Sequence, residues 1–396
     1  MMIATGSLAL AACATDMDAQ NQSTATDDGS PDGEPSVPTM RACSGGQWQC
    51  KAQIVVDENN RIKPAATPSG LGPADLVSAY KLSSTITSTA TIAIVDAFNY
   101  PNVESDLASY RSQFGLPACT KANGCLKVVN QNGATSPLPG NSPAGDDWTV
   151  EAALDLDMAS AVCPTCKLLF IEAQDDQGNG LFIGQNAAAA AGAIVVSNSW
   201  GGPSGGLASD QSMDQQFFTH TGKIQTFIAS GDSGNTGNTP DYPSTSTLVT
   251  GVGGTSLKKS TTAARGWTES AWNGAGSSCG NEAKPAFQNV TTGCANRAAS
   301  DVSAVASPNT GVAVFNKGSG GFIVVGGTSA ASPLVAGIVA RYSGVVTWSP
   351  GYAYAHTTQF FDITSGSNGT CTSALCRAGK GWDGPTGIGT PNGAAL

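Results

Sequence analysis

Short runs of hydrophobic residues recur along the chain, and polar or glycine-rich segments separate them. Residues 92–95, 168–171, 194–196 and 226–229 are such runs, and none of them alternates hydrophobic with polar positions. This pattern is typical of parallel strands whose two faces are both covered by helices. The sequence therefore predicts an α/β fold in which a mostly parallel central sheet is flanked by helices on both faces.

Residues 148–161 are mostly good helix formers, and they are predicted as an amphipathic helix. Glu151 and Asp155 are four residues apart, so they lie on one face of this helix. Asp157 lies off that face and is predicted as a solvated residue. Two close carboxyls raise the pKa of one of them, and such a pair can share a proton and act as acid and base. Taken alone, however, this spacing is more often an ordinary solvated acidic face.

The segment Gly-Gly-Thr-Ser-Ala-Ala-Ser-Pro places Ser329 between a predicted strand that ends at Val325 and a predicted buried helix at residues 330–341. A hydroxyl on the first turn of a helix lies near free N–H groups, which stabilise developing negative charge. Ser329 is therefore a candidate nucleophile. The alternative interpretation is a buried glycine-rich turn in which Ser329 caps the helix.

Few histidines are present to serve as the base of such a serine. The chain has two, His220 and His356. His356 follows Ser329 in the chain, and His220 lies at the predicted end of a helix, so both are predicted to be structural or surface residues. A Ser-His-Asp triad is therefore not expected, and the carboxylates remain as candidate bases.

Together, Glu-x-x-Leu-Asp and Gly-Gly-Thr-Ser-x-x-x-Pro resemble the motifs of the sedolisin family of serine-carboxyl peptidases, which have a subtilisin-like fold. The resemblance covers residues 70–396. It implies that Ser329 is the nucleophile, that Glu151 is the general base and acid, and that Asp155 shares the proton of Glu151.

The resemblance extends to Ser-Gly-Asp-Ser-Gly, where it implies that Asp232 points into an oxyanion hole with the backbone N–H of Ser329 as second donor. An aspartate donates only when it is protonated, so a raised pKa and activity favoured at acidic pH are expected. Loss of one such donor typically costs about 3 kcal/mol of transition-state stabilisation. Without the resemblance, this segment is a simple Asp-Ser-Gly turn.

Two further strand ends are implied to border the site. Ser199, Trp200 and Gly201 follow a buried strand, and in relatives this edge hydrogen-bonds an extended peptide substrate. Asp96 ends another strand, and it is implied to lie behind Glu151 as a second layer of the site. The alternative for Asp96 is a turn residue at the end of its strand.

Near the C-terminus, two loops rich in aspartate and glycine resemble the family's calcium site. Oxygen-rich loops of this kind suit a hard cation. Without the resemblance, the aspartates are turn-formers. The ligands implied for one structural Ca²⁺ are the carboxylates of Asp362 and Asp383 and the backbone carbonyls of Ile363, Gly379 and Gly381.

Composition narrows the class of protein. With 396 residues, of which 40% are hydrophobic, the chain can bury a large core. Its formal net charge of −10 disfavours nucleic-acid binding. No later segment is long enough to span a membrane. The expected partners are protein or peptide substrates, and the expected state is a monomer.

Eleven cysteines indicate an oxidising compartment, so the predicted location is extracellular or the cell envelope. A Cys-Pro-Thr-Cys segment could also be a redox centre or half of a zinc site, but it follows a helix instead of opening one. Ten cysteines form close sequential pairs, which local disulfides explain most simply: Cys43 with Cys50, Cys119 with Cys125, Cys163 with Cys166, Cys279 with Cys294, and Cys371 with Cys376.

Cys13 is the odd cysteine, and it ends a segment that resembles a bacterial lipoprotein signal. The expected basic residues are missing ahead of it, so an ordinary truncated signal peptide is the alternative. The predicted organisation is a signal or lipobox-like segment at residues 1–13 and a disordered tether at residues 14–42. A short cystine-bearing segment at residues 43–69 and a peptidase domain at residues 70–396 follow.

The sequence between Cys13 and the predicted domain is too short for the long N-terminal prodomain that this family usually carries. Either a separate chaperone exists, folding needs none, or the protein is not activated in the usual manner. The predicted function is an extracytoplasmic serine-carboxyl endopeptidase, a lipid anchor being its only expected contact with a membrane. Two alternatives remain at this point, a catalytically silent surface protein that binds peptides on the same scaffold and a calcium-dependent structural protein.

Overall fold

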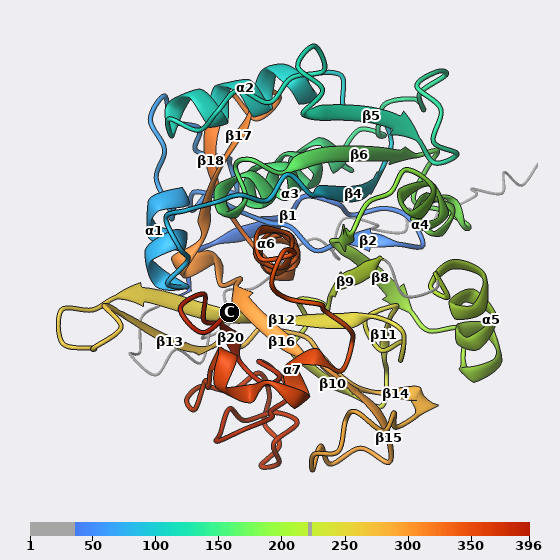
Figure 1. The fold of residues 1–396 in the computed structure, drawn as a ribbon, viewed down its shortest axis with the longest axis vertical. Coiled ribbons are helices and arrows are strands. Elements are labelled where there is room, and N and C mark those ends of the chain that lie inside the picture. Colours follow the sequence, from blue (N-terminus) through green and yellow to red (C-terminus); the bar gives the residue numbers. More distant parts are fainter. Residues whose placement is uncertain (1–35, 221–223) are drawn as a thin grey trace, which may run out of the picture.

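The computed structural model describes residues 36–220 and 224–396, and an eight-stranded sheet forms its centre (Figure 1). The strand order is β13-β12-β9-β7-β4-β6-β5, and β16 also pairs with β12. All pairs are parallel except β12 with β13. The strands are β4 (Thr91–Ala97), β5 (Leu126–Asn130), β6 (Lys167–Ala173), β7 (Val195–Asn198), β9 (Gln225–Ala229), β12 (Thr250–Lys259), β13 (Trp267–Ala271) and β16 (Val302–Val305).

The four hydrophobic runs of the sequence are β4, β6, β7 and β9, which lie side by side in the middle of this sheet. Helices cover both of its faces. On β4, Val95 packs against Gly184 of α4, whereas the next residue, Asp96, faces the carboxyls of α3. Successive side chains of a strand point to opposite faces, so α3 and α4 lie on opposite sides. The predicted fold class is confirmed.

Seven helices occur among the described residues. The buried glycine Gly337 lets α6 pack closely against Val162 and Ala159 of α3, so these two helices form a pair (Figure 1). The helices are α1 (Pro73–Ala79), α2 (Val103–Gln113), α3 (Trp148–Val162), α4 (Gly180–Ala190), α5 (Leu207–Phe217), α6 (Thr328–Arg341) and α7 (Tyr352–Ala355).

The helix α3 is buried on every side, so the prediction of an amphipathic helix was wrong. Asp157, predicted as solvated, is buried, and it accepts a hydrogen bond from the backbone N–H of Phe315 at 3.0 Å. The cause is that α3 lies beneath a second, antiparallel sheet, which covers the face that would otherwise contact water. Burial raises the pKa of Asp157.

This second sheet has the order β1-β3-β18-β17 and joins the N-terminal segment to the strand that precedes α6. The strand β1 lies within residues 14–42, so the end of the predicted tether is ordered. The predictions for residues 1–13, including lipidation of Cys13, lie outside the described residues. The strands of the smaller sheets are β1 (Thr39–Arg41), β3 (Gln53–Val55), β17 (Val312–Asn316) and β18 (Gly321–Gly326); β2 (Gln49–Cys50), β8 (Trp200–Pro203) and β11 (Asp241–Tyr242); β10 (Asn235–Gly237), β14 (Ser277–Ala283) and β15 (Asn296–Ala299); and β19 (Phe360–Phe361) and β20 (Thr390–Pro391).

The five expected disulfides are all present: Cys43–Cys50, Cys119–Cys125, Cys163–Cys166, Cys279–Cys294 and Cys371–Cys376.

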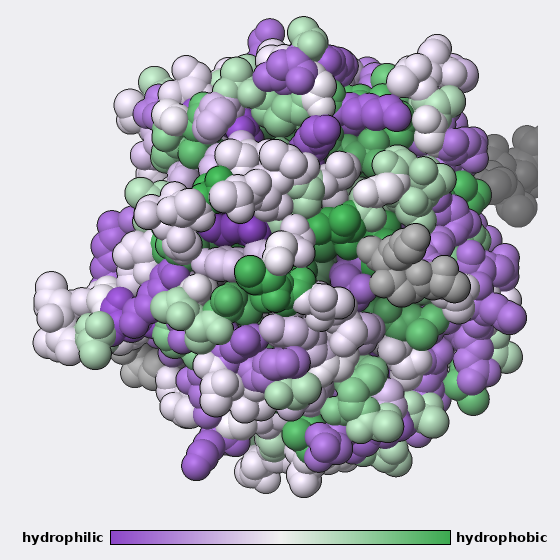
Figure 2. Space-filling view, viewed as in Figure 1, coloured by the Kyte–Doolittle hydropathy of each residue, from purple (hydrophilic) through white to green (hydrophobic). Residues whose placement is uncertain are grey.

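The surface facing the viewer carries hydrophobic side chains in separate patches among polar ones (Figure 2). In the described ranges, no helix has both the length and the hydrophobicity that crossing a membrane requires.

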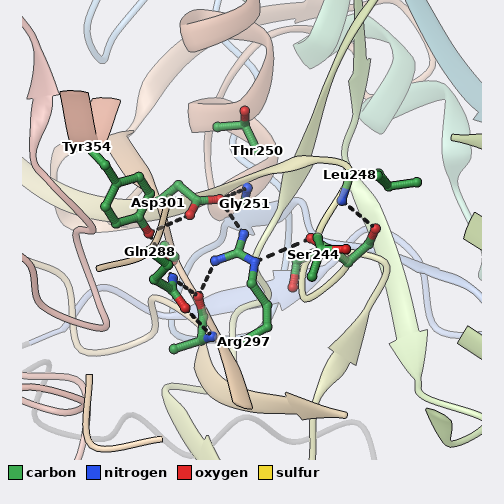
Figure 3. A network of polar contacts seen from close by, with 12 residues as sticks. Ser244, Leu248, Thr250, Gly251, Gln288, Arg297, Asp301 and Tyr354 are labelled. Carbon is green, nitrogen blue, oxygen red and sulfur yellow. Dashed lines mark hydrogen bonds and ion pairs between the residues drawn. The ribbon is translucent and has the colours of Figure 1, made fainter. Parts of the chain in front are cut away.

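A buried ion pair connects the sheet to the C-terminal region (Figure 3). Arg297 and Asp301 are both fully buried, and the guanidinium donates to the carboxylate. The carboxylate also accepts from the backbone N–H of Gly251 at 2.8 Å and from the hydroxyl of Tyr354 at 2.6 Å. These contacts hold β12, β15 and α7 together.

We predict that Asp301→Ala lowers the free energy of unfolding by about 3–5 kcal/mol, because it leaves the Arg297 guanidinium buried without its anion. Urea unfolding with the disulfides intact measures this change. The control is Arg61→Ala, which removes an ion pair from a side chain that is 73% exposed and should hardly change stability. If both substitutions lowered the free energy of unfolding equally, burial of the ion pair would not explain the cost of losing it.

Candidate active site

The first turn of α6 brings Ser329 against α3. The hydroxyl of Ser329 donates a hydrogen bond to Oε2 of Glu151 at 2.9 Å, and both residues are fully buried. Gly327 precedes the helix with a φ of 97°, a left-handed conformation that favours glycine, and this allows the sharp turn from β18. Glu151 therefore lies where a base can take the proton of the Ser329 hydroxyl.

Asp155 lies one helical turn after Glu151, as the spacing predicts. Its Oδ1 accepts a hydrogen bond from the hydroxyl of Ser199 at 2.7 Å. The backbone carbonyl of Ser199 in turn accepts from the Ser329 hydroxyl at 3.2 Å. Burial raises the pKa of Asp155, and the negative charges of Asp96 and Glu151 raise it further. The two carboxyls of α3 thus interact with each other and with the nucleophile candidate.

Asp96 lies inside β4, and the turn interpretation does not describe it. Its side chain is fully buried, and neither of its oxygens has a hydrogen-bond partner among the described residues. Burial raises the pKa of Asp96 to about 8. The pKa of Glu151 is raised, first by burial and next by the charge of Asp96. Asp96 therefore lies behind the carboxyl pair of α3, where its ionisation and that of the pair disfavour each other.

Asp232 follows β9 in the chain, and its side chain contacts Thr328, the first residue of α6, next to Ser329. Its Oδ1 accepts from both the backbone N–H and the hydroxyl of Thr328, each at 2.8 Å. Its Oδ2 accepts from Nε2 of Gln53 at 3.1 Å. Burial raises the pKa of Asp232, although the Thr328 donors oppose this shift. The position agrees with a carboxyl placed beside the expected oxyanion.

The two histidines have other surroundings. His356 is exposed, stacks on the ring of Tyr352 at 4.1 Å, and contacts the backbone carbonyl of Tyr352 through Nδ1 at 2.9 Å. His220 is partly buried, and burial lowers its pKa. The structure gives the Ser329 hydroxyl a carboxylate partner instead of an imidazole.

The strand β8, expected to bind substrate, is already paired with another part of the chain. Within the β2–β8 pair, Gln49 and Cys50 lie antiparallel to Gly201 and Trp200. The backbone N–H of Lys51 continues this pairing by donating to the carbonyl of Ser199 at 3.0 Å. The expected substrate-binding edge is therefore covered by a segment of the N-terminal region.

The next residues of this segment reach the carboxyls of the site. The backbone N–H of Ala52 donates to Oε2 of Glu151 at 2.9 Å. The ammonium group of Lys51, which is only 7% exposed, lies 2.6 Å from Oδ2 of Asp241. Gly202, Ser230 and Asp241 line the pocket that Lys51 enters.

Sequence reasoning missed the contributions of Lys51, Gln53 and Asp241, because the N-terminal segment was treated as a separate unit. Its contacts with β8 and α3 are distant in sequence, and no periodic pattern marks them. A lysine beside a cystine and an aspartate near a proline are common residues, so they offered no signal from which these contacts could have been found.

The two C-terminal loops that resemble a calcium site lie together. Asp383 is buried, and its Oδ2 accepts from the N–H of Gly379 at 3.1 Å, while Asp362 accepts from the N–H of Gly381 at 3.1 Å. Burial and, to a smaller extent, the charge of Asp362 raise the pKa of Asp383 to about 7. Neighbouring carboxylates suit a hard cation, and the backbone groups of Gly379 and Gly381 that contact them here are N–H donors. The described ranges contain no group of three or more histidine, cysteine or acidic side chains that could hold a metal.

Comparison with known proteins identifies similar sequences along most of the chain. Residues 140–359 match the model of the Subtilase family. Kumamolisin from Bacillus sp. (strain MN-32) is 31% identical over 393 residues, which cover 90% of the chain and 66% of kumamolisin. Sedolisin from Pseudomonas sp. (strain 101) is 31% identical over 370 residues, which cover 82% of the chain and 60% of sedolisin. The chain thus spans somewhat less than two thirds of the length of these relatives.

Solved structures of peptidases also superpose on most of the chain. The structure of Pseudomonas sedolisin complexed with two molecules of pseudo-iodotyrostatin superposes with a TM-score of 0.69 and 26% identity, and covers 83% of the chain and 97% of that structure. The S41 psychrophilic protease superposes with a TM-score of 0.52 at 19% identity, covering 82% of the chain and 98% of that structure. The second match supports the fold alone.

We predict that the free energy of unfolding falls as the pH rises from about 4 to about 8. Asp96 has a pKa of about 8 in the folded state, against an ordinary pKa of 3.8 for an aspartate side chain in water. Between these values the folded state binds more protons than the unfolded state, so each pH unit costs at most about 1.4 kcal/mol per proton. Urea unfolding at several pH values measures the slope.

Asp96→Asn should make this slope shallower, because the amide carries no titrating proton. The matched control is Glu58→Gln, which changes an exposed carboxyl on the surface. Stability that is constant or increases over this pH range in the unaltered protein would contradict the prediction.

Proposed function

Because the chain belongs to the subtilase family and is a homologue of sedolisin and kumamolisin, we propose that it is a serine-carboxyl endopeptidase. The observation that carries this proposal is the hydrogen bond from the Ser329 hydroxyl to Glu151 at 2.9 Å, inside a buried cluster of carboxyls. Its proposed substrates are peptides and proteins that bind in extended form along Ser199, Trp200 and Gly201, the edge that β2 covers in this structure.

The reaction passes through an acyl-enzyme. The Ser329 oxygen attacks the carbonyl carbon of the scissile bond while Glu151 takes the hydroxyl proton. The protonated Asp232 and the backbone N–H of Ser329 stabilise the oxyanion. Glu151 then gives a proton to the leaving amine, and the C–N bond breaks. Water, activated by Glu151, hydrolyses the acyl-enzyme and releases Ser329.

Asp155 and Asp96 determine where the proton resides. Asp155 shares a proton with Glu151, and ionisation of Asp96 and ionisation of this pair disfavour each other, so Asp96 keeps its own proton in acidic solution. Asp232 donates a hydrogen bond only in its protonated form, which its raised pKa favours. Activity is therefore greatest in acidic solution, where Asp232 is protonated and Glu151 and Asp155 hold one proton between them, so that Glu151 can still accept the proton of Ser329.

Residues 70–396 are proposed as the peptidase domain, and residues 43–69 as a cystine-bearing segment that packs against it by pairing β2 with β8 and β3 with β18. The proposed oligomeric state is a monomer. The proposed location is outside the cytoplasm, since disulfides persist in oxidising compartments. In such a location, lipidation of Cys13 would attach it to the cell envelope. The carboxylates of Asp362 and Asp383 and the carbonyls of Ile363, Gly379 and Gly381 would hold one Ca²⁺, which would stabilise the C-terminal loops.

Cleavage of a denatured, generic protein between about pH 3 and about pH 8 tests the proposal. We expect acid-favoured cleavage that Ser329→Ala reduces by roughly three orders of magnitude or more, because the nucleophile is removed. The control, Ser332→Ala, alters another buried serine of α6 whose hydroxyl contacts Ser197 at 3.0 Å, and it should keep its activity. Full cleavage by Ser329→Ala would contradict the mechanism, and no cleavage by the unaltered protein would favour a silent peptide-binding protein.

Removal of calcium tests the metal site separately. Adding Ca²⁺ to chelator-treated protein should raise the Tm by several degrees, because a ligand that binds only the folded state stabilises it. Asp383→Asn should abolish this calcium-dependent rise, whereas Asp57→Asn, at a partly exposed residue paired with Arg61, should leave it unchanged. The measurement is thermal unfolding with and without the ion. An equal rise in all three proteins would contradict the site.

A further inference from the structure

Two aspartates outside the proposed active site face each other next to the cystine loop, which comprises residues 43–50 and is closed by its disulfide. Asp146 lies in the loop before α3, and Asp176 follows β6. These residues are only 5% and 3% exposed. Their carboxyl groups lie within hydrogen-bonding reach of each other, and burial and then the charge of Asp146 raise the pKa of Asp176 to about 6. Two like charges thus meet away from water.

The two carboxyl groups differ in the donors that reach them. Oδ1 of Asp146 accepts from the backbone N–H groups of Ser44 at 3.1 Å and Gly45 at 3.3 Å. Oδ1 of Asp176 accepts from Nε2 of Gln177 at 3.1 Å. Oδ2 of Asp176 is buried and has no hydrogen-bond partner among the described residues. A buried acceptor without a donor is costly, so this oxygen is free to bind a cation.

The backbone of Gly46 lies directly against this oxygen. A Cβ added at Gly46 would be only 1.9 Å from Oδ2 of Asp176, much closer than van der Waals contact allows. The φ of Gly46 is 80°, a left-handed conformation that also favours glycine. Glycine at this position therefore lets the cystine loop close over the carboxyl group of Asp176 without a side chain of its own.

No lysine or arginine of the described ranges forms an ion pair with either carboxyl group. The ion pairs between described residues join other partners: Lys51 with Asp241, Arg61 with Asp57, Lys259 with Asp75, Arg265 with Glu269, and Arg297 with Asp301. Buried carboxylates in contact need either a shared proton or a bound cation. Above the pKa of Asp176 the shared proton is lost, and the cation remains as the means of compensation.

The spacing and the location of the pair suit Ca²⁺. Two oxygens that bind one Ca²⁺ at a right angle, each about 2.4 Å from it, are about 3.4 Å apart, which is close to hydrogen-bonding reach. Ca²⁺ accepts a flexible shell of carboxylates, backbone carbonyls and water, whereas Mg²⁺ demands a near-ideal octahedron. Extracellular Ca²⁺ modules bind the ion in the submillimolar to millimolar range, which agrees with the location proposed above.

We propose that Asp146 and Asp176 form a second, low-affinity Ca²⁺ site, which fastens the cystine loop to the loop before α3 and to the end of β6. The ion binds Oδ2 of Asp176 and the carboxylate of Asp146, and backbone carbonyls or water complete its shell. This site is separate from the C-terminal loops of Asp362 and Asp383. It does not depend on the reaction proposed for Ser329.

The site would act on contacts that the cystine loop already makes. The backbone N–H groups of Gln47 and Trp48 donate to the carbonyl of Asp176 at 3.2 Å and 3.0 Å. Together with the N–H groups on Asp146, these bonds attach the loop to the same two aspartates whose charges repel each other. A cation removes this repulsion, so it should slow the opening of the cystine loop.

The two proposed Ca²⁺ sites are separable by concentration. The C-terminal loops offer carboxylates and several implied carbonyls, whereas this pair offers two carboxylates, and the described residues hold no group of three acidic, histidine or cysteine side chains. Fewer protein ligands bind Ca²⁺ more weakly. Below the millimolar range, Ca²⁺ therefore fills the C-terminal loops and leaves this pair empty.

The experiment titrates Tb³⁺, a Ca²⁺ analogue that emits when a nearby tryptophan is excited, into the full chain at about pH 7, where the carboxyls are ionised. The chain carries Asp383→Asn, which removes the C-terminal site. The backbone N–H groups of Trp148 and Trp48 donate to the carbonyls of Asp146 and Asp176, so both tryptophans lie near the site. We expect emission that saturates at about one ion per chain and that millimolar Ca²⁺ displaces.

Adding Asp176→Asn should weaken Tb³⁺ binding about tenfold or more, because it removes a charged ligand. The amide of the new side chain can donate to Asp146, so the fold is kept, and an unchanged Tm checks this. The matched control is Asp175→Asn, which alters the neighbouring, half-exposed aspartate and should leave the emission unchanged. Absence of saturable emission, or equal emission with Asp176→Asn, would overturn the proposal and leave a proton-sharing pair.

Hydrogen exchange measures the fastening of the cystine loop. In the Asp383→Asn chain, Ca²⁺ at about 10 mM should slow exchange of the backbone N–H groups of residues 44–48 several-fold. In the chain that also carries Asp176→Asn, the ion should not change their exchange. Exchange that Ca²⁺ leaves unchanged in both chains would overturn the proposal. None of these results depends on cleavage by Ser329, so the proposed function stands or falls separately.

Discussion

The burial of three carboxyl groups in one place is the constraint on which the rest of the site depends. Asp96 of β4 and Glu151 and Asp155 of α3 are fully buried, and the charges that act on them come largely from one another. Ionising all three in the same low-dielectric space is costly, so protons remain bound at pH values where free carboxyls have lost them. The fold supplies the burial by enclosing α3 between the central sheet and the sheet of β1, β3, β17 and β18.

The same enclosure brings the Ser329 hydroxyl and the N-terminal segment into contact with the carboxyls of the site. A hydroxyl on the first turn of α6 meets a protonatable carboxyl because α6 and α3 pack closely at a glycine, Gly337. The N-terminal segment completes the enclosure, since the N–H of Ala52 and the amide of Gln53 each bind a carboxyl of the site. The protons held by the buried carboxyls and the filling of the cleft by the N-terminal segment thus both result from the enclosure of α3.

Much of this arrangement could be predicted from local sequence. The strand-turn-helix pattern around Ser329 and the four-residue spacing of Glu151 and Asp155 depend only on backbone geometry, so the structure has them where they were expected. The exposure of Asp157 was mispredicted, because a helix with several acidic residues normally faces water and the sequence shows no covering sheet. The contacts of Lys51 with Asp241 join residues far apart in the chain, and local patterns carry no information about them.

The most direct test of the account is an infrared titration of the carboxyl groups in the folded protein. The account predicts that a signal from protonated carboxyls persists at about pH 7 and that Glu151→Gln or Asp96→Asn removes part of it. The infrared signal of each variant is subtracted from that of the unaltered protein, so the contributions of the other buried carboxyls cancel. If neither substitution changed the signal at that pH, Glu151 and Asp96 would be ionised in the folded state. The proton-holding site described here would then be contradicted.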